Sequence, residues 1–217
     1  MSTALGAAAS APATTSSVLK AAKAAMAKQT GVHVVTFSKS GPYVMLLTAD
    51  VGTKSGQETW SEGKATVTIR LTPTGAYISG NSYGLTTMGH LTAAQAKKVG
   101  KDWIYVKAGT SGYAAFKSGF SIAALADYLP VAKGTKLSTT VTDGVRQYVL
   151  KWTTTGSSSA LKLSNTMTIS AVGATLPVEK ITTTAKSGSE TTKFSMWGEH
   201  VAVSAPPAAS TIAESKI

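Results

Sequence analysis

The sequence contains no cysteine, so disulfides, thiol nucleophiles and thiolate-bound metals are excluded. Acidic residues are also scarce, with 10 Asp and Glu against 21 Lys and Arg, and arginine occurs only as Arg70 and Arg146. No segment approaches the roughly 20 consecutive apolar residues that a membrane-spanning helix requires. The chain must therefore fold around an apolar core of its own, and its 217 residues are enough to build one.

The net charge of +11 indicates a surface that attracts anionic membranes or cell-wall polymers at low salt. Nucleic acid is not an expected partner, because the lysines are scattered along the chain. In addition, arginine, the side chain that most often reads guanine, is nearly absent. We expect a monomer with a solvated, mildly cationic surface.

The pattern that is present is an alternation of apolar and polar residues with a period of two. The segment ATVTIRL (65–71) alternates without a break, which is typical of a half-buried antiparallel strand. Further strands are predicted for VHVVTFS, YVMLLTADV, AYISG, WIYVK, YAAFKS, QYVLKW, ALKLSNTMTIS, VEKITTTA, TTKFSMW and HVAVSA. Short turns such as Asp143-Gly144 join most of them. About ten strands without strand–helix alternation predict a β-rich α+β fold with one strongly curved antiparallel sheet.

Three short helices are predicted to accompany this sheet. The first begins at Ser16 or Ser17 and ends at Gly31, and the second runs over 92–100 from a capping box. The third, SIAALADYL, is stopped by Pro130. These helices are too few and too small to cover a wide sheet. We therefore predict an unfilled concavity at its apolar face, or packing against a partner.

The elements form a single predicted domain over residues 17–207, between a disordered spacer at 1–16 and a disordered tail at 208–217. The first 15 residues lack the basic and apolar regions of a signal peptide. They are typical of the spacer that follows a processing site in exported proteins. Our hypothesis is that the full-length gene product carries an upstream signal and an acylated cysteine, which anchors it in the cell envelope.

Several stretches carry a resemblance to a known family. ISAVGATLPVEKITTT and TTKFSMWGEHVAVSAPP contain an LPV step and an ending of the form F-S-x-W-G-x-x-V-x-V-x-A-P. RLTPTGAYISGNSYGL, followed by KDWIYV, contains a hairpin, a G-N turn and a W-I-x-V strand. In these residues the chain resembles bacterial lipoproteins of the LolA-like superfamily, most closely the LppX/LprG-type actinobacterial branch. The element order agrees over residues 18–207, but recognisable residues are confined to 77–85, 176–178 and 194–203.

The resemblance implies a half-barrel of antiparallel strands with a few short helices on its concave side. The space between them is an apolar cavity, which in relatives takes the acyl chains of lipids or lipoproteins. Relatives are exported, are often anchored through an acylated N-terminal cysteine, and are not enzymes. This chain contains no such cysteine. Other branches use the half-barrel as a sensory or protein-binding module, so a shared fold does not settle the ligand.

One catalytic arrangement competes with this interpretation. The segment from Gly80 to Gly84 matches G-x-S-x-G, and Asp127, Asp143 and His200 follow Ser82 in the chain order of an α/β-hydrolase. A nucleophile elbow, however, joins a buried parallel strand directly to a long helix. Here a hairpin strand precedes the motif, and residues 85–89 separate it from any predicted helix. We interpret the motif as a turn and predict that the protein is not an enzyme.

No metal or cofactor site is predicted. His33, His90 and His200 each lack a histidine or carboxylate at ligand spacing, and no calcium-binding or phosphate-binding loop is present. The two glutamates Glu58 and Glu62 are predicted to be solvated in a glycine-rich turn.

The apolar face of the sheet is the remaining candidate site. We predict an exported lipoprotein-type protein that shelters lipid acyl chains there, since each buried methylene contributes about 0.8 kcal/mol. The alternative is a non-catalytic sensory or protein-binding module with a filled core, and a more distant one is the serine esterase. The predicted wall comprises Val67, Ile69, Leu71, Leu150, Leu163, Met167 and Ile169, and the predicted lid comprises Met88, Phe116, Phe120, Leu125 and Tyr128.

Overall fold

The structure is a computed structural model that describes residues 13–155, 162–184 and 188–217. The helices are α1 (Thr15–Met26), α2 (Ser82–Thr87), α3 (Ala93–Val99), α4 (Ser111–Gly119) and α5 (Ile122–Leu125), with short 3-10 turns η1 (Ala126–Tyr128), η2 (Ala208–Ser210) and η3 (Glu214–Lys216). The strands are β1 (Gly31–Ser40), β2 (Tyr43–Gly52), β3 (Gly56–Glu62), β4 (Ala65–Thr72), β5 (Gly75–Gly80), β6 (Trp103–Lys107), β7 (Lys136–Thr142), β8 (Val145–Thr155), β9 (Lys162–Ser170), β10 (Pro177–Thr184), β11 (Gly188–Ser195) and β12 (Thr211–Ala213).

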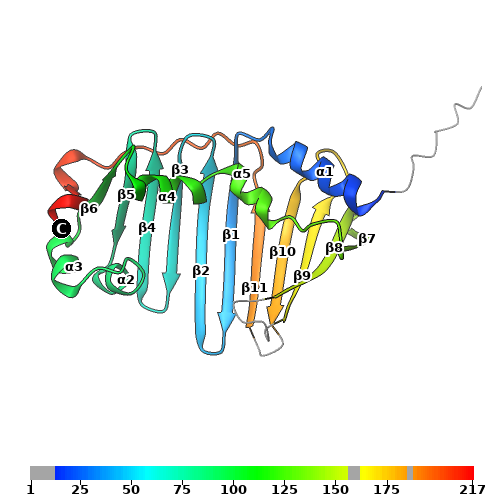
Figure 1. Ribbon diagram of the computed structural model, residues 1–217, viewed down its shortest axis with the longest axis horizontal. Coiled ribbons are helices and arrows are strands. Elements are labelled where there is room, and N and C mark those ends of the chain that lie inside the picture. The colour runs from blue at the N-terminus through cyan, green and yellow to red at the C-terminus, as the bar shows by residue number, and fades with distance from the viewer. Residues whose placement is uncertain (1–12, 156–161, 185–187) are drawn as a thin grey trace, which may run out of the picture.

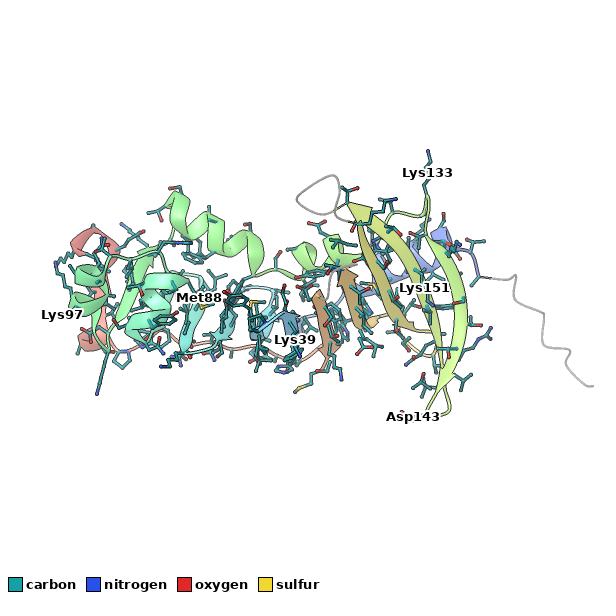
Figure 2. The ribbon with its side chains drawn as sticks, turned by 90° about the horizontal axis from the view of Figure 1, so that it is seen from below. Lys39, Met88, Lys97, Lys133, Asp143 and Lys151 are labelled. Atoms are coloured by element: carbon teal, nitrogen blue, oxygen red, sulfur yellow. The ribbon has the colours of Figure 1, made fainter. Side chains whose placement is uncertain are left out.

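The described strands form one sheet in the order β12-β6-β5-β4-β3-β2-β1-β11-β10-β9-β8-β7 (Figure 1). Two antiparallel meanders meet in its middle, where β1 pairs with β11 and Val34 lies opposite Phe194. The pairing of β12 with β6 is parallel. Figure 2 shows that this sheet is bent rather than flat, with the helices on one side. The predicted β-rich α+β fold with a strongly curved antiparallel sheet is confirmed.

Helix α1 covers one half of the sheet. Thr14 caps it, because the Thr14 and Ser17 side chains each accept a hydrogen bond from the other residue's backbone N–H. The cap therefore precedes the predicted Ser16 or Ser17, and the domain begins before residue 17. The apolar stripe of α1 packs on the concave face of β1, β2 and β8–β11, in a core that includes Val18, Leu19, Ala22, Met26, Leu150, Met167 and Ile169.

The other half of the sheet is covered by two smaller apolar clusters. Tyr113 and Phe120 of α4 pack on Leu71 and Val106, and the Tyr113 hydroxyl donates a hydrogen bond of 2.9 Å to the carbonyl oxygen of Thr72. Helices α2 and α3 enclose the second cluster, formed by Leu85, Ala96, Val99 and Ile104. The concave face is thus covered in separate patches, and much of β2 and β1 lies uncovered in Figure 1.

One segment that was predicted to be extended and one that was predicted to be a turn are helical. YAAFKS lies in α4, because Thr110 caps a helix there and the apolar residues pack on the sheet. The predicted separation of residues 85–89 from any helix is also wrong, since α2 begins at Ser82, directly after its cap Asn81. In both cases tertiary packing and a cap outweigh the short local pattern.

Three further predictions are corrected at the level of strands. The segment around Trp60 is a strand, β3, and not a turn, because β2 and β4 hydrogen-bond to both of its edges. HVAVSA is not a strand, while KLSTTVT forms the edge strand β7, which the sequence analysis did not identify. The tail at 208–217 is not disordered, because β12 pairs with β6 and Ile217 packs beside α3. Residues 1–12 of the predicted spacer lie outside the described residues.

Candidate functional site

A groove of about 490 Å³ lies on the concave face of the sheet, beneath α4 and α5. We call it the central groove. Strands β1–β4 form its floor and the helices form its roof. Its lining comprises Val34, Thr36, Met45, Leu47, Ala49, Val51, Glu58, Trp60, Ile69, Ala115, Phe116, Gly119, Phe120, Leu125, Tyr128 and Glu190. The groove is mostly apolar, as expected of a site for an apolar ligand.

Two further hollows adjoin the central groove. The first, about 300 Å³, shares Met45, Glu58, Trp60 and Ile69 with it and ends at Met88, so we call it the Met88 hollow. The second, about 550 Å³, shares Tyr128 and Glu190 with the groove and is lined partly by Lys180, so we call it the Lys180 cleft. The shared residues make the three hollows neighbours in a row across the sheet from β4 to β8, and we call the row the trough.

The alternation of β2, β3 and β4 explains which side chains face this trough. Residues on neighbouring strands that are directly opposite share a face, and Glu58 lies between Ala49 and Ile69. Trp60 in the same way lies between Leu47 and Val67. Burial in these surroundings raises the pKa of the Glu58 carboxyl to about 7, with the nearby Trp60 indole N–H acting weakly in the opposite direction.

Polar side chains gather where the central groove meets the Lys180 cleft. The Lys180 ammonium lies 4.7 Å from the centre of the Tyr128 ring, a cation–π contact. Burial lowers the pKa of Lys180, opposed by the charge of Glu190. Burial also raises the pKa of Tyr128, and the charges of Glu190 and Glu58 add to this. The junction is therefore a polar region of the trough.

The structure divides the predicted site residues into two groups. Val67, Ile69, Met88, Phe116, Phe120, Leu125 and Tyr128 line the central groove or the Met88 hollow, and Leu163 lines the Lys180 cleft. Leu71 packs against Tyr113 and Phe120, and Leu150, Met167 and Ile169 are fully buried beneath α1. This second group fills the core, because Tyr113 and Phe120 cover Leu71 and the long helix α1 covers the other three residues. Whether the first group contacts a ligand stays a prediction.

Several lining residues were missed by the sequence analysis. Met45 and Leu47 share one face of β2 by the alternation of YVMLLTADV. The alternation does not show whether this face lies on the concave or the convex side of the sheet. Glu58 and Trp60 were assigned to a solvated turn, whereas both face the trough from β3. Trp60 is the only apolar residue of QETWSE, so this segment carries no alternation of apolar and polar residues that could have identified the strand.

The G-x-S-x-G segment has a structural explanation. A Cβ atom at Gly80 or Gly84 would lie 2.5 Å or 2.4 Å from the carbonyl oxygen of Thr66, so both glycines permit close packing on β4. The Asn81 side chain accepts a hydrogen bond of 2.6 Å from the Gly84 backbone N–H. Asp143, in the β7–β8 turn, is at the opposite end of the sheet from Ser82. The structure therefore does not bring Asp143 to Ser82.

The histidines and carboxylates form no metal-binding cluster in the described ranges. His33 Nδ1 lies 2.6 Å from Asp50 Oδ1, on the face of the sheet opposite the groove. Among residues 13–155, 162–184 and 188–217, no group of three or more histidines and carboxylates is placed to hold a metal ion. Of the helices that the structure describes, none is both long and apolar enough to cross a bilayer.

No protein-family model matches the chain, and no curated protein matches its sequence. Among solved structures, it is similar to the crystal structure of Mycobacterium tuberculosis lipoprotein LppX, with a TM-score of 0.53 and 16% sequence identity. The alignment covers 88% of this chain and 98% of that chain. At this identity the similarity shows the fold, and it confirms the predicted resemblance to the LppX/LprG-type branch at that level.

Proposed function

We propose that the protein is an exported lipoprotein-type binding protein, which shelters the acyl chains of lipids in the trough and catalyses no reaction. The apolar central groove is the observation that carries this proposal. Its volume of about 490 Å³ lies within the roughly 300–1,000 Å³ of typical small-molecule sites. The shared fold with the lipoprotein LppX supports a role in the cell envelope.

The driving force for binding is the removal of the chain from water. Each methylene that enters the groove contributes about 0.8 kcal/mol, so a long acyl chain gains useful affinity without any polar contact. Methionine and aromatic side chains line both the floor and the roof, as Met45, Trp60 and Phe116 illustrate. Such side chains adapt to chains of different shape. We therefore propose lipids as the class of ligand, without selectivity for one particular lipid.

A second candidate function is a protein-binding module of the same fold. It is favoured by the part of the concave face directly beneath α1, where Leu150, Met167 and Ile169 are fully buried. The open trough beside this part is the observation against it. A protein without any affinity for apolar probes would support this second candidate.

The test replaces one groove residue and one matched residue on the opposite face. Leu47 lines the central groove, whereas its neighbour Leu46 is 43% exposed on the other face of β2. Binding of the neutral fluorophore N-phenyl-1-naphthylamine is measured by fluorescence for the native protein, Leu47→Arg and Leu46→Arg. We expect Leu47→Arg to weaken binding by roughly tenfold or more, because an unpaired charge is buried in an apolar site. Leu46→Arg leaves binding unchanged.

Native mass spectrometry of the purified protein supplies an independent measurement. A co-purifying acyl lipid that is present in the native protein and in Leu46→Arg, and depleted in Leu47→Arg, supports the proposal. Equal binding by both variants would place the fluorophore elsewhere and reject the central groove as the site.

A further inference from the structure

Glu58 lies at the middle of the trough, in the lining shared by the central groove and the Met88 hollow. Its cross-strand neighbours, Ala49 on β2 and Ile69 on β4, are apolar. The next residue along the same face of β3 toward the helices is Gly56, where a Cβ atom would lie 2.7 Å from the Phe120 ring. Phe120 therefore packs directly on β3, and Glu58 lies just beyond it. Within the described residues no ion pair reaches this carboxyl, and the effect of burial on its pKa exceeds the opposite effect of the neighbouring Trp60 indole N–H.

Trp60 lies on the same face of β3, two residues further on, and carries a second unused polar group. Its indole Nε1 is buried and finds no hydrogen-bond partner in the part of the chain that the structure describes. A buried donor without a partner costs about 1–3 kcal/mol, so most such groups are satisfied in native proteins. Both groups belong to the lining shared by the central groove and the Met88 hollow.

Burial, and not a neighbouring charge, favours the neutral form of Glu58. The titratable groups that face this region are Glu62 on β3, Glu190 on β11, Tyr128 on η1 and Lys180 on β10. The facing strands β2 and β4 present no titratable side chain to the trough. Lys180 contacts the Tyr128 ring, and no salt bridge joins it to Glu58 in the described ranges. Near neutral pH the carboxyl is therefore half protonated and can donate as well as accept a hydrogen bond.

We propose that Glu58 and Trp60 form a polar docking point, which binds the neutral oxygen function of an amphiphile whose hydrocarbon part fills the trough. This inference rests on the proposed function. The Trp60 N–H requires an acceptor, such as an ester carbonyl oxygen, and the Glu58 carboxylic acid pairs with a hydroxyl or a carbonyl. Because hollows extend to both sides of the pair, the ligand class is a lipid with a hydroxyl or ester group between or beside its chains.

The test compares a neutral amphiphile with a cationic one of equal chain length. Displacement of N-phenyl-1-naphthylamine by 1-monopalmitoylglycerol and by hexadecylammonium is measured at pH 5.5 and pH 8. The proteins are the native chain, Glu58→Gln, Trp60→Phe and, as a matched carboxyl control on the same face of β3, Glu62→Gln. The affinity for the fluorophore itself reports whether each variant keeps an intact apolar groove.

We expect Trp60→Phe to weaken monopalmitoylglycerol binding roughly 3- to 10-fold, the loss of one hydrogen bond, while fluorophore binding stays within twofold. The native protein binds monopalmitoylglycerol several-fold more tightly at pH 5.5 than at pH 8. Glu58→Gln, which cannot ionise, removes this pH dependence, and Glu62→Gln retains it.

Two results would overturn the docking point while leaving the proposed function intact. In the first, all variants bind monopalmitoylglycerol as the native protein does, although the fluorophore binds normally. In the second, the native protein binds hexadecylammonium more tightly as the pH rises, and Glu58→Gln shows no such increase. This result would show that Glu58 acts as a carboxylate that binds cations. If the native protein binds neither the fluorophore nor monopalmitoylglycerol, the proposed function fails, and the docking point with it.

Discussion

At the scale of single residues, the energetically unusual feature is a carboxyl group placed on the apolar face of a strand. Glu58 is flanked by Ala49 and Ile69, and no charged partner compensates for its burial within the described residues. A strand optimised only for stability would carry an apolar side chain at this position. Its presence there is consistent with a functional role.

Glu58 also gives the protein a defined dependence of stability on pH. Its pKa rises from 4.5 in the unfolded chain to about 7 in the fold, so between these values the unfolded chain releases a proton that the native state retains. Stability from this group is therefore present below about pH 4.5 and is lost as the pH rises through 7. The loss is on the order of 3 kcal/mol.

The measurement is urea unfolding of the native protein and of Glu58→Gln at pH 5 and pH 8. We expect the free energy of unfolding of the native protein to fall relative to that of Glu58→Gln by roughly 2–3 kcal/mol between the two pH values. Subtracting the value for Glu58→Gln from that for the native protein at each pH cancels the contribution of all other titrating groups to the free energy of unfolding. If the free energies of unfolding of the two proteins differ by the same amount at pH 5 and pH 8, Glu58 does not have a raised pKa in the native state.

At the scale of elements, the helices are held against the sheet at points of close backbone approach. Gly84 in α2 is one of these, because its missing side chain lets the helix rest on the Thr66 backbone of β4. Gly119, at the end of α4, is also helical, but a Cβ atom there would meet nothing within 4 Å. The two glycines form a matched pair for testing helix–sheet packing.

We expect Gly84→Ala to destabilise the fold by roughly 1–3 kcal/mol, because the added methyl group forces α2 away from β4. Gly119→Ala should leave the stability unchanged or increase it by up to about 1 kcal/mol, since alanine has the higher helix propensity. Thermal unfolding followed by circular dichroism measures both. Equal and small effects would show that α2 does not rest on β4 as described.

At the scale of the whole molecule, the dominant property is the net charge of +11. The basic side chains are spread over the surface, as the positions of Lys39, Lys97, Lys133 and Lys151 in Figure 2 illustrate. Such a distribution produces a broad attraction to anionic surfaces and not a specific site. We propose that it brings the protein to the anionic membranes or wall polymers that carry its lipid.

This attraction has a measurable signature. We expect the protein to co-sediment with vesicles of phosphatidylglycerol and phosphatidylcholine at 20 mM salt, and to be released at 500 mM salt, because screening shortens the range of charge interactions to a few ångströms. Vesicles of phosphatidylcholine alone serve as the control and should not bind. Binding to both vesicle types that persists at high salt would instead indicate insertion of apolar side chains.

The sequence by itself determined the fold class, because alternation with a period of two fixes which side chains share a face wherever a strand forms. It indicated most of the strands, the capping box of α3 and the Asp143-Gly144 turn, where both residues adopt positive φ. All of these follow from interactions between residues close in sequence.

Only the tertiary structure decided how the two meanders join and which part of the concave face stays open. The pairing of β1 with β11 and the position of α1 bury Leu150, Met167 and Ile169 while leaving the floor around Trp60 uncovered. Strand β3 forms because partners on both edges satisfy its backbone, in spite of two glutamates on its inner face. These outcomes depend on contacts between segments distant in the chain, which no local pattern records.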